Sequence, residues 1–207
     1  MSVTRPTATT DRHPTNPFAT RYTRPGAIPP LDERGLPRSV LGLLETIDRL
    51  GGSVAFTGPH GTGKSTHLAA VAAALRAEGW RVQSIRVRRC RDLLPVLTAL
   101  GRTAGGGTLC IDGWESLGAP AGLLVVLLAR LRGVRLIVTS HRPTLLPTAV
   151  RTEATFPLLT GIIERLPPAG DLLTPADLAG AFTRHAGNLR ESLAELYDVV
   201  EARRRGW

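Results

Sequence analysis

Two kinds of hydrophobic segment alternate along the chain between residues 36 and 160. Short apolar runs and strict alternations predict strands, whereas apolar residues spaced three and four apart predict helices. The expected strands are residues 52–57, 81–87, 108–112, 135–140 and, with the weakest pattern, 156–159. The expected helices are residues 36–50, 66–78, 92–100, which Asp92 would cap, and 121–132. This alternation is typical of a parallel sheet with helices on both faces.

After residue 160 the pattern predicts helices alone. Residues 162–166 form one short candidate, and Thr174 followed by Pro175 and Asp177 has the composition of a helix start. A longer helix is expected at residues 189–204, where apolar residues recur at helical spacing. The sequence therefore predicts an N-terminal arm at residues 1–35, an α/β core at residues 36–160 and a helical lid at residues 161–207.

The first 35 residues are rich in threonine, proline and arginine and show almost no apolar periodicity. Such a composition is typical of a disordered or extended arm. Phe18, Tyr22 and Ile28 are the exceptions, because large apolar side chains are costly to leave in water. We expect these three residues to bring part of the arm onto the body of the protein.

The composition supports a globular protein. Of the 207 residues, 43% are hydrophobic and only 4% aromatic, which predicts a core of leucine, valine, alanine and isoleucine. No apolar stretch reaches the roughly 18 residues of a membrane span, and no signal-peptide pattern is present, so we expect a soluble cytoplasmic protein. Cys90 and Cys110 lack the spacing of metal ligands or of a disulfide framework, which favours buried or reduced structural thiols.

The positive charge of the chain is compatible with two classes of partner, nucleic acids and acidic proteins. The formal net charge is +9, and arginines cluster at residues 81–91 and 203–205. These clusters would suit a nucleic acid or an acidic protein, but no helix-turn-helix, zinc or aromatic-stacking signature accompanies them. A solvated edge and a frayed tail explain the same residues.

The chain has 26 lysine and arginine residues, and only one of them, Lys64, is a lysine. It stands in a segment that matches G-x-x-x-x-G-K-[ST], the phosphate-binding P-loop. Backbone N–H groups of such a loop and the N-terminus of the following helix bind phosphate, and the lysine adds a compact charge that arginine does not reproduce. The predicted nucleotide-binding residues are Gly58, Pro59, His60, Gly61, Thr62, Gly63, Lys64, Ser65 and Thr66.

Two acids follow the strand predicted at residues 108–112. Asp112 ends this strand, where P-loop enzymes place the carboxylate that holds Mg²⁺, and Ser65 would supply a second oxygen. Glu115 lies three residues later and is the candidate base for the attacking water. Many ATPases place this glutamate directly after the aspartate, so a solvated loop residue is the alternative interpretation of Glu115.

The next strand ends in polar residues as well. Ser140 at its tip is the candidate for holding the attacking water beside the γ-phosphate, the alternative being an ordinary turn residue. Arg142 and Arg151 are candidates for a phosphate contact in the same subunit or for an arginine finger offered to a neighbour.

The order of these motifs, followed by Gly187, Asn188, Leu189 and Arg190 at a helix start, resembles the AAA+ ATPases and the related STAND ATPases. The resemblance covers about residues 36–204. It implies a three-layer P-loop NTPase sandwich with a parallel five-stranded sheet and a small C-terminal helical lid. It assigns Ser140 as sensor 1 and Arg190 as sensor 2, which touches the γ-phosphate. The split between Asp112 and Glu115, and the lack of a clear arginine-finger motif, depart from the family pattern.

Together these features predict an ATP- and Mg²⁺-dependent ATPase that couples its nucleotide state to a partner. Lys64, Glu115, Ser140 and Arg190 are the expected catalytic residues, while Ser65 and Asp112 are the expected metal ligands. Homo-oligomerisation is compatible with the resemblance, and no membrane association is expected. Two alternatives remain: a P-loop kinase for a small acceptor, and a nucleotide-binding switch with little turnover. The choice between ATP and GTP stays open.

Overall fold

The computed structural model describes residues 16–103 and 105–206. Within them, five strands form one parallel sheet in the order β2-β3-β4-β1-β5. This confirms the predicted α/β class with five parallel strands. The strands are β1 (Val54–Thr57), β2 (Val82–Arg86), β3 (Thr108–Asp112), β4 (Arg135–Ser140) and β5 (Thr148–Arg151).

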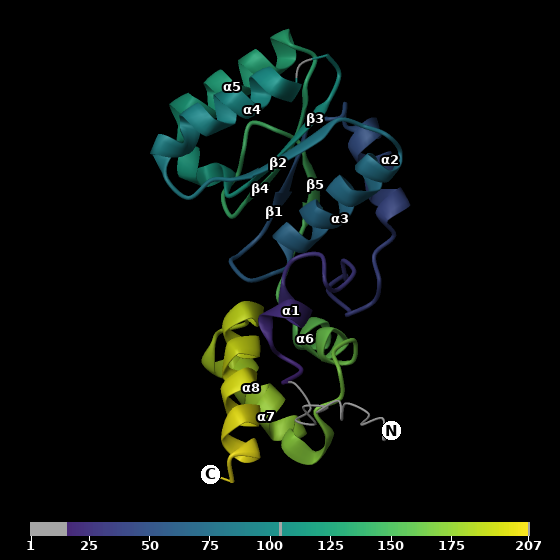
Figure 1. Ribbon diagram of the computed structural model, residues 1–207, viewed down its shortest axis with the longest axis vertical. Helices are drawn as coiled ribbons and strands as arrows, with labels where there is room; N and C mark the ends of the chain where they lie inside the picture. The colour runs from purple at the N-terminus through teal and green to yellow at the C-terminus, as the bar shows by residue number, and fades with distance from the viewer. Residues whose placement is uncertain (1–15, 104, 207) are drawn as a thin grey trace, which may run out of the picture.

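Helices cover both faces of the sheet (Figure 1). Helices α2 (Val40–Arg49) and α3 (Lys64–Ala77) pack on one face, and α4 (Leu93–Thr103) and α5 (Ala119–Leu131) pack on the other. Successive residues of a buried strand point to opposite faces. In β1, Phe56 accordingly packs among the residues of α2 and α3, whereas Ala55 faces the cluster beneath α4 and α5.

The last predicted strand is wrong. Residues 156–159 begin helix α6 (Phe156–Ile163), and the fifth strand is formed instead by β5. Thr155 caps α6, because its side chain accepts a hydrogen bond from the Leu158 amide, and Pro157 lies in the first turn. The apolar run therefore packs as a helix. Strand β5 lies at an edge of the sheet and is only partly buried, so it lacks a continuous apolar run.

Among the described residues three helices follow the sheet: α6, which crosses the expected boundary between core and lid at residue 160, α7 (Pro175–Arg184) and α8 (Leu189–Arg204). We refer to these three helices as the lid. They lie below the sheet in Figure 1. Helix α7 begins with the predicted capping box between Thr174 and Asp177. Arg203 of α8 binds the same carboxylate at 2.8 Å. The Arg203 hydrogen bond, followed by those of Thr174, holds the pKa of Asp177 well below its usual range.

The N-terminal segment lies against these helices. Residues 1–15 of the expected arm lie outside the described residues; from Asn16 onward the segment contains the short helix α1 (Thr20–Thr23). Phe18 is buried among lid residues such as Leu196, as predicted, and Tyr22 and Ile28 pack against the same cluster. The arm thus contributes to the core of the lid.

The remaining elements of the described ranges are three 3₁₀ turns at Cys90–Asp92, Trp114–Leu117 and Gly170–Leu172. Asp92 does not cap α4 as expected; its carboxylate accepts hydrogen bonds from the Arg88 and Arg89 amides and so holds the first of these turns. No helix among the described residues is long and apolar enough to cross a membrane.

Candidate functional site

The glycine-rich loop joins β1 to α3 and is fixed to the end of β5. The Gly58 amide donates to the Ser140 carbonyl at 3.2 Å, and the Thr62 and Thr152 hydroxyl oxygens are 2.6 Å apart. A Cβ at Gly58 would collide with the backbone and side chain of Thr152. The close approach of these segments therefore requires glycine and holds the loop at the carboxyl ends of the strands.

Lys64 is the first residue of α3 and follows Gly63, which has the left-handed conformation. Its Nζ folds back over the loop, donating to the Gly58 carbonyl at 2.8 Å and to the Pro59 carbonyl. Burial lowers the pKa of the Lys64 ammonium, while Glu115 and Asp112 act to raise it. An ammonium group thus lies at a helix N-terminus inside a loop of backbone amides, which is the arrangement that binds phosphate.

Asp112 is the centre of a hydrogen-bond network at the end of β3. Its Oδ1 accepts from the Ser65 hydroxyl at 2.8 Å and from the Thr139 hydroxyl at 2.7 Å, and its Oδ2 accepts from Arg86 Nε at 2.9 Å. Burial acts to raise the pKa of the Asp112 carboxyl. The three hydrogen bonds outweigh burial and hold that pKa below its usual range, so the group is a carboxylate at neutral pH.

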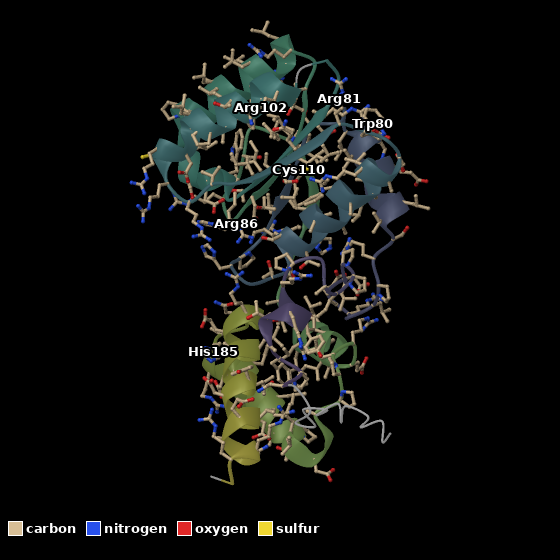
Figure 2. The ribbon with its side chains drawn as sticks, viewed as in Figure 1. Trp80, Arg81, Arg86, Arg102, Cys110 and His185 are labelled. Atoms are coloured by element: carbon tan, nitrogen blue, oxygen red, sulfur yellow. The ribbon has the colours of Figure 1, made fainter. Side chains whose placement is uncertain are left out.

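The structure brings Asp112 and Ser65 together as the sequence predicted, but sequence reasoning missed Arg86 and Thr139. Both are register partners of Asp112 on the neighbouring strands. Residues in register on parallel strands point to the same face, so the strand order would have identified them. Arg86 lies at the end of the core that faces the lid (Figure 2).

Glu115 is held by a histidine that the sequence did not single out. The carboxylate Oε1 is 2.8 Å from His141 Nδ1, and Oε2 is buried with no hydrogen-bond partner among the described residues. The His141 ring lies 4.1 Å from the ring of His60 in the loop, measured between centroids. Trp114, which precedes Glu115, is buried beneath α5 and anchors the 3₁₀ turn that carries the glutamate.

Ser140 is buried beside the loop, and its hydroxyl group is hydrogen-bonded to a backbone amide. It accepts a hydrogen bond from the Arg142 amide at 3.1 Å, and Thr139 instead contacts Asp112. The side chains of Arg142 and Arg151 are exposed, and neither forms an ion pair within the described residues.

The N-terminus of α8 meets the loop directly. Asn188 caps this helix by accepting from the Glu191 amide, and a Cβ at Gly61 would collide with the Asn188 side chain. The Arg190 amide would also lie close to that Cβ, while the Arg190 side chain is exposed. Nearby, His185 of the lid binds Glu195 at 2.8 Å (Figure 2). The residues predicted to bind nucleotide thus form the segment that links β1 to α3 and the first turn of α3; the linking residues are Gly58, Pro59, His60, Gly61, Thr62 and Gly63, and the helix begins with Lys64, Ser65 and Thr66.

Comparisons with known proteins identify the fold. No protein-family model matches the chain, and no curated protein matches its sequence. Among solved structures, the replication initiator DnaA bound to AMPPCP and single-stranded DNA gives a TM-score of 0.54 at 14% identity, over 79% of this chain and 62% of that chain. A DNA replication initiation factor gives 0.50 at 14% identity, over 80% and 63%. The chain therefore spans less than two thirds of these structures, and the likeness concerns the fold.

Proposed function

Starting from the AAA+ P-loop ATPase-like fold of this chain, we propose that it binds ATP with Mg²⁺ in the loop Gly58–Lys64 and hydrolyses it. One observation carries the proposal: the loop, the Lys64 ammonium and the Ser65–Asp112 pair converge at one edge of the sheet. The loop amides and Lys64 bind the phosphates. The AMPPCP bound to the similar DnaA structure supports a nucleotide as the ligand.

The donor set at this edge fits Mg²⁺. A hydroxyl and an ionised carboxylate, Ser65 and Asp112, lie within hydrogen-bond distance of each other, and hard oxygen ligands are what Mg²⁺ prefers. Ser65 and Asp112 would hold the ion beside the phosphates, where it would supply positive charge against the charge that develops during transfer. Thr139 and Arg86 hold the Asp112 carboxylate in place from the two neighbouring strands.

Glu115 is the proposed base for the attacking water. His141 fixes one carboxylate oxygen, which leaves the buried Oε2 without a partner among the described residues. A buried acceptor without a partner favours a water molecule as donor, and a carboxylate positioned in this way orients the water and takes its proton. This arrangement supports hydrolysis over a switch without turnover.

The lid reports the nucleotide state. Asn188 already packs against Gly61 of the loop, and the exposed Arg190 follows it on the same helix turn. We assign Arg190 to the γ-phosphate and Ser140, whose hydroxyl accepts from the Arg142 amide and can still donate its own proton, to the attacking water. Closure of the lid then transmits the state of the loop to a partner. With its net charge of +9, the chain would suit a nucleic acid or an acidic protein as that partner.

Phosphate release from ATP, measured with and without single-stranded DNA, tests this function. We expect Mg²⁺-dependent hydrolysis by the wild type, and Glu115→Gln should lower kcat by about 10²–10⁴-fold while ATP binding persists. Glu164→Gln, an exposed glutamate of the lid, is the matched control and should leave kcat unchanged. Equal hydrolysis by Glu115→Gln and the wild type would show that Glu115 is not the base. Phosphate transfer to a metabolite without release to water would favour a kinase instead.

A further inference from the structure

A separate cavity lies at the end of the sheet opposite the loop Gly58–Lys64. Its volume is about 240 Å³, and it opens between α2, the end of α3 and the amino ends of β3 and β4. The loop follows the carboxyl end of β1, so the loop lies at the carboxyl ends of the parallel strands and the cavity lies at their amino ends. Trp80, which lines the cavity, accordingly lies at the end of the core away from the lid (Figure 2).

The wall of the cavity is apolar except for one hydroxyl group. Leu44, Ile47, Leu75 and Ile137 line it with aliphatic side chains. Thr108 also lines it, is fully buried, and has no hydrogen-bond partner for Oγ1 among the described residues. Buried hydroxyl groups are rarely left without a partner, so the cavity offers an unused acceptor to a ligand that carries a donor.

The mouth of the cavity is acidic in a protein whose net charge is +9. Glu45, Asp48 and Glu78 line it, and Arg135 is the only basic residue among the described residues that line the cavity. Arg135 already pairs with Asp48 at 2.8 Å. Glu45 and Glu78 are exposed and form no ion pair in the described part of the chain. The mouth therefore has a local excess of two negative charges.

The contacts of Arg135 indicate which kind of chemical group the mouth of the cavity can bind. The guanidinium carbon of Arg135 lies 4.6 Å from the ring centroid of Trp80 while the same group binds Asp48. An aromatic face combined with carboxylates is a favourable environment for a cation. Arg135 satisfies only one of the three carboxylates, so Glu45 and Glu78 remain to bind a second cation.

We propose that this cavity binds an aliphatic cation, an alkyl chain that ends in a guanidinium or ammonium group. The alkyl chain contacts the aliphatic wall, and the N–H donors of the head group are shared between the two glutamates and Thr108 Oγ1. The volume of about 240 Å³ lies below the roughly 300–1,000 Å³ of pockets for drug-sized ligands, which suits one such chain and excludes a nucleotide.

Isothermal titration calorimetry with N-butylguanidinium tests the proposal, and N-butylurea is its neutral counterpart of similar shape. We expect the cation to bind and the urea not to bind, with an affinity that falls as salt is raised. The double variant Glu45→Gln/Glu78→Gln should weaken binding about tenfold or more, because both charges of the mouth are lost. The matched control, Glu164→Gln/Asp198→Asn, removes two exposed charges from the lid and should leave binding unchanged.

A second variant tests the buried hydroxyl. Thr108→Val keeps the shape of the side chain and removes the unpartnered oxygen, so it should weaken binding of N-butylguanidinium without lowering the melting temperature. Equal binding of N-butylguanidinium and N-butylurea, no binding of either, or full binding by the double glutamine variant would each overturn the proposal. ATP binding should be unchanged in these variants, so that loss of cation binding can be distinguished from damage to the proposed ATP site.

The source of the cation is identified by a second titration. A blocked pentapeptide with one central arginine presents the same head group on a backbone. Tighter binding of this peptide than of N-butylguanidinium assigns the cavity to an arginine side chain of a partner protein, whereas tighter binding of N-butylguanidinium assigns it to a free small molecule.

Discussion

The contact between Gly61 and Asn188 couples the stability of the loop to the cap of α8. Gly61 has a φ of +74°, and its missing Cβ leaves the space that the Asn188 side chain fills. Gly61→Ala therefore brings two costs: the strain of a left-handed L-residue, about 1–2 kcal/mol, and displacement of the Asn188 cap, about 1 kcal/mol. We expect a total loss of about 2–3 kcal/mol in the free energy of unfolding.

The double-mutant cycle isolates the contact. Asn188→Ala alone removes the cap and should cost about 1 kcal/mol. The double variant should lose no more than Gly61→Ala alone, because the cap is lost only once, which gives an interaction energy of about 1 kcal/mol. Gly79→Ala is the strain control, since Gly79 has a φ of +85° and an added Cβ would meet nothing within 4 Å.

Urea unfolding in the absence of nucleotide measures all four proteins and the control. Strict additivity of Gly61→Ala and Asn188→Ala would refute the coupling. A loss for Gly61→Ala no larger than that for Gly79→Ala would likewise show that the lid does not press on the loop.

Three further predictions follow from single side chains. His141→Ala should lower kcat of ATP hydrolysis with little change in KM, because Glu115 loses its orienting partner; restoration by His141→Asn, which keeps a donor, would separate positioning from a general loss of structure. Asp177→Asn should destabilise the lid by about 1 kcal/mol near neutral pH. Because the pKa of Asp177 is depressed in the folded protein, its stabilisation is fully present above its unfolded-state pKa and is lost as the pH falls through the lower folded-state pKa, so the stability difference between this variant and the wild type should begin to shrink below about pH 4 and vanish only at still lower pH. A thiol reagent should modify the exposed Cys90 rapidly and Cys110 only on unfolding, because burial raises the pKa of Cys110 to about 12; fast modification of two thiols in the folded protein would contradict this.

The parts of the fold that rest on contiguous patterns were predictable from the sequence. The P-loop is one continuous motif, and the helices at 175–184 and 189–204 carry their own capping residues. The fifth strand shows where contiguous patterns fail. Strand β5 is a half-exposed edge strand and has no apolar run that would mark it. Residues 156–159 contain two adjacent leucines, but the Thr155 cap and Pro157 make this segment the start of a helix.

A site residue was predictable only where its position in the local sequence pattern marks it. Asp112 ends an apolar strand, which sufficed to place it beside Ser65. Arg86 and Thr139 became visible only through strand register, because nothing in their local sequence points to Asp112. Both cysteines are free, in line with the expectation of buried or reduced thiols, but which of the two is exposed depends on the 3₁₀ turn that contains Cys90.

ATP binding and hydrolysis by Lys64→Ala test the central claim most directly. The account predicts that this variant, with an unchanged circular dichroism spectrum, loses ATP binding or turnover, because the ammonium group held over the loop by the Gly58 and Pro59 carbonyls is the charge proposed to meet the phosphates. A folded Lys64→Ala protein that binds and hydrolyses ATP as the wild type does would contradict it.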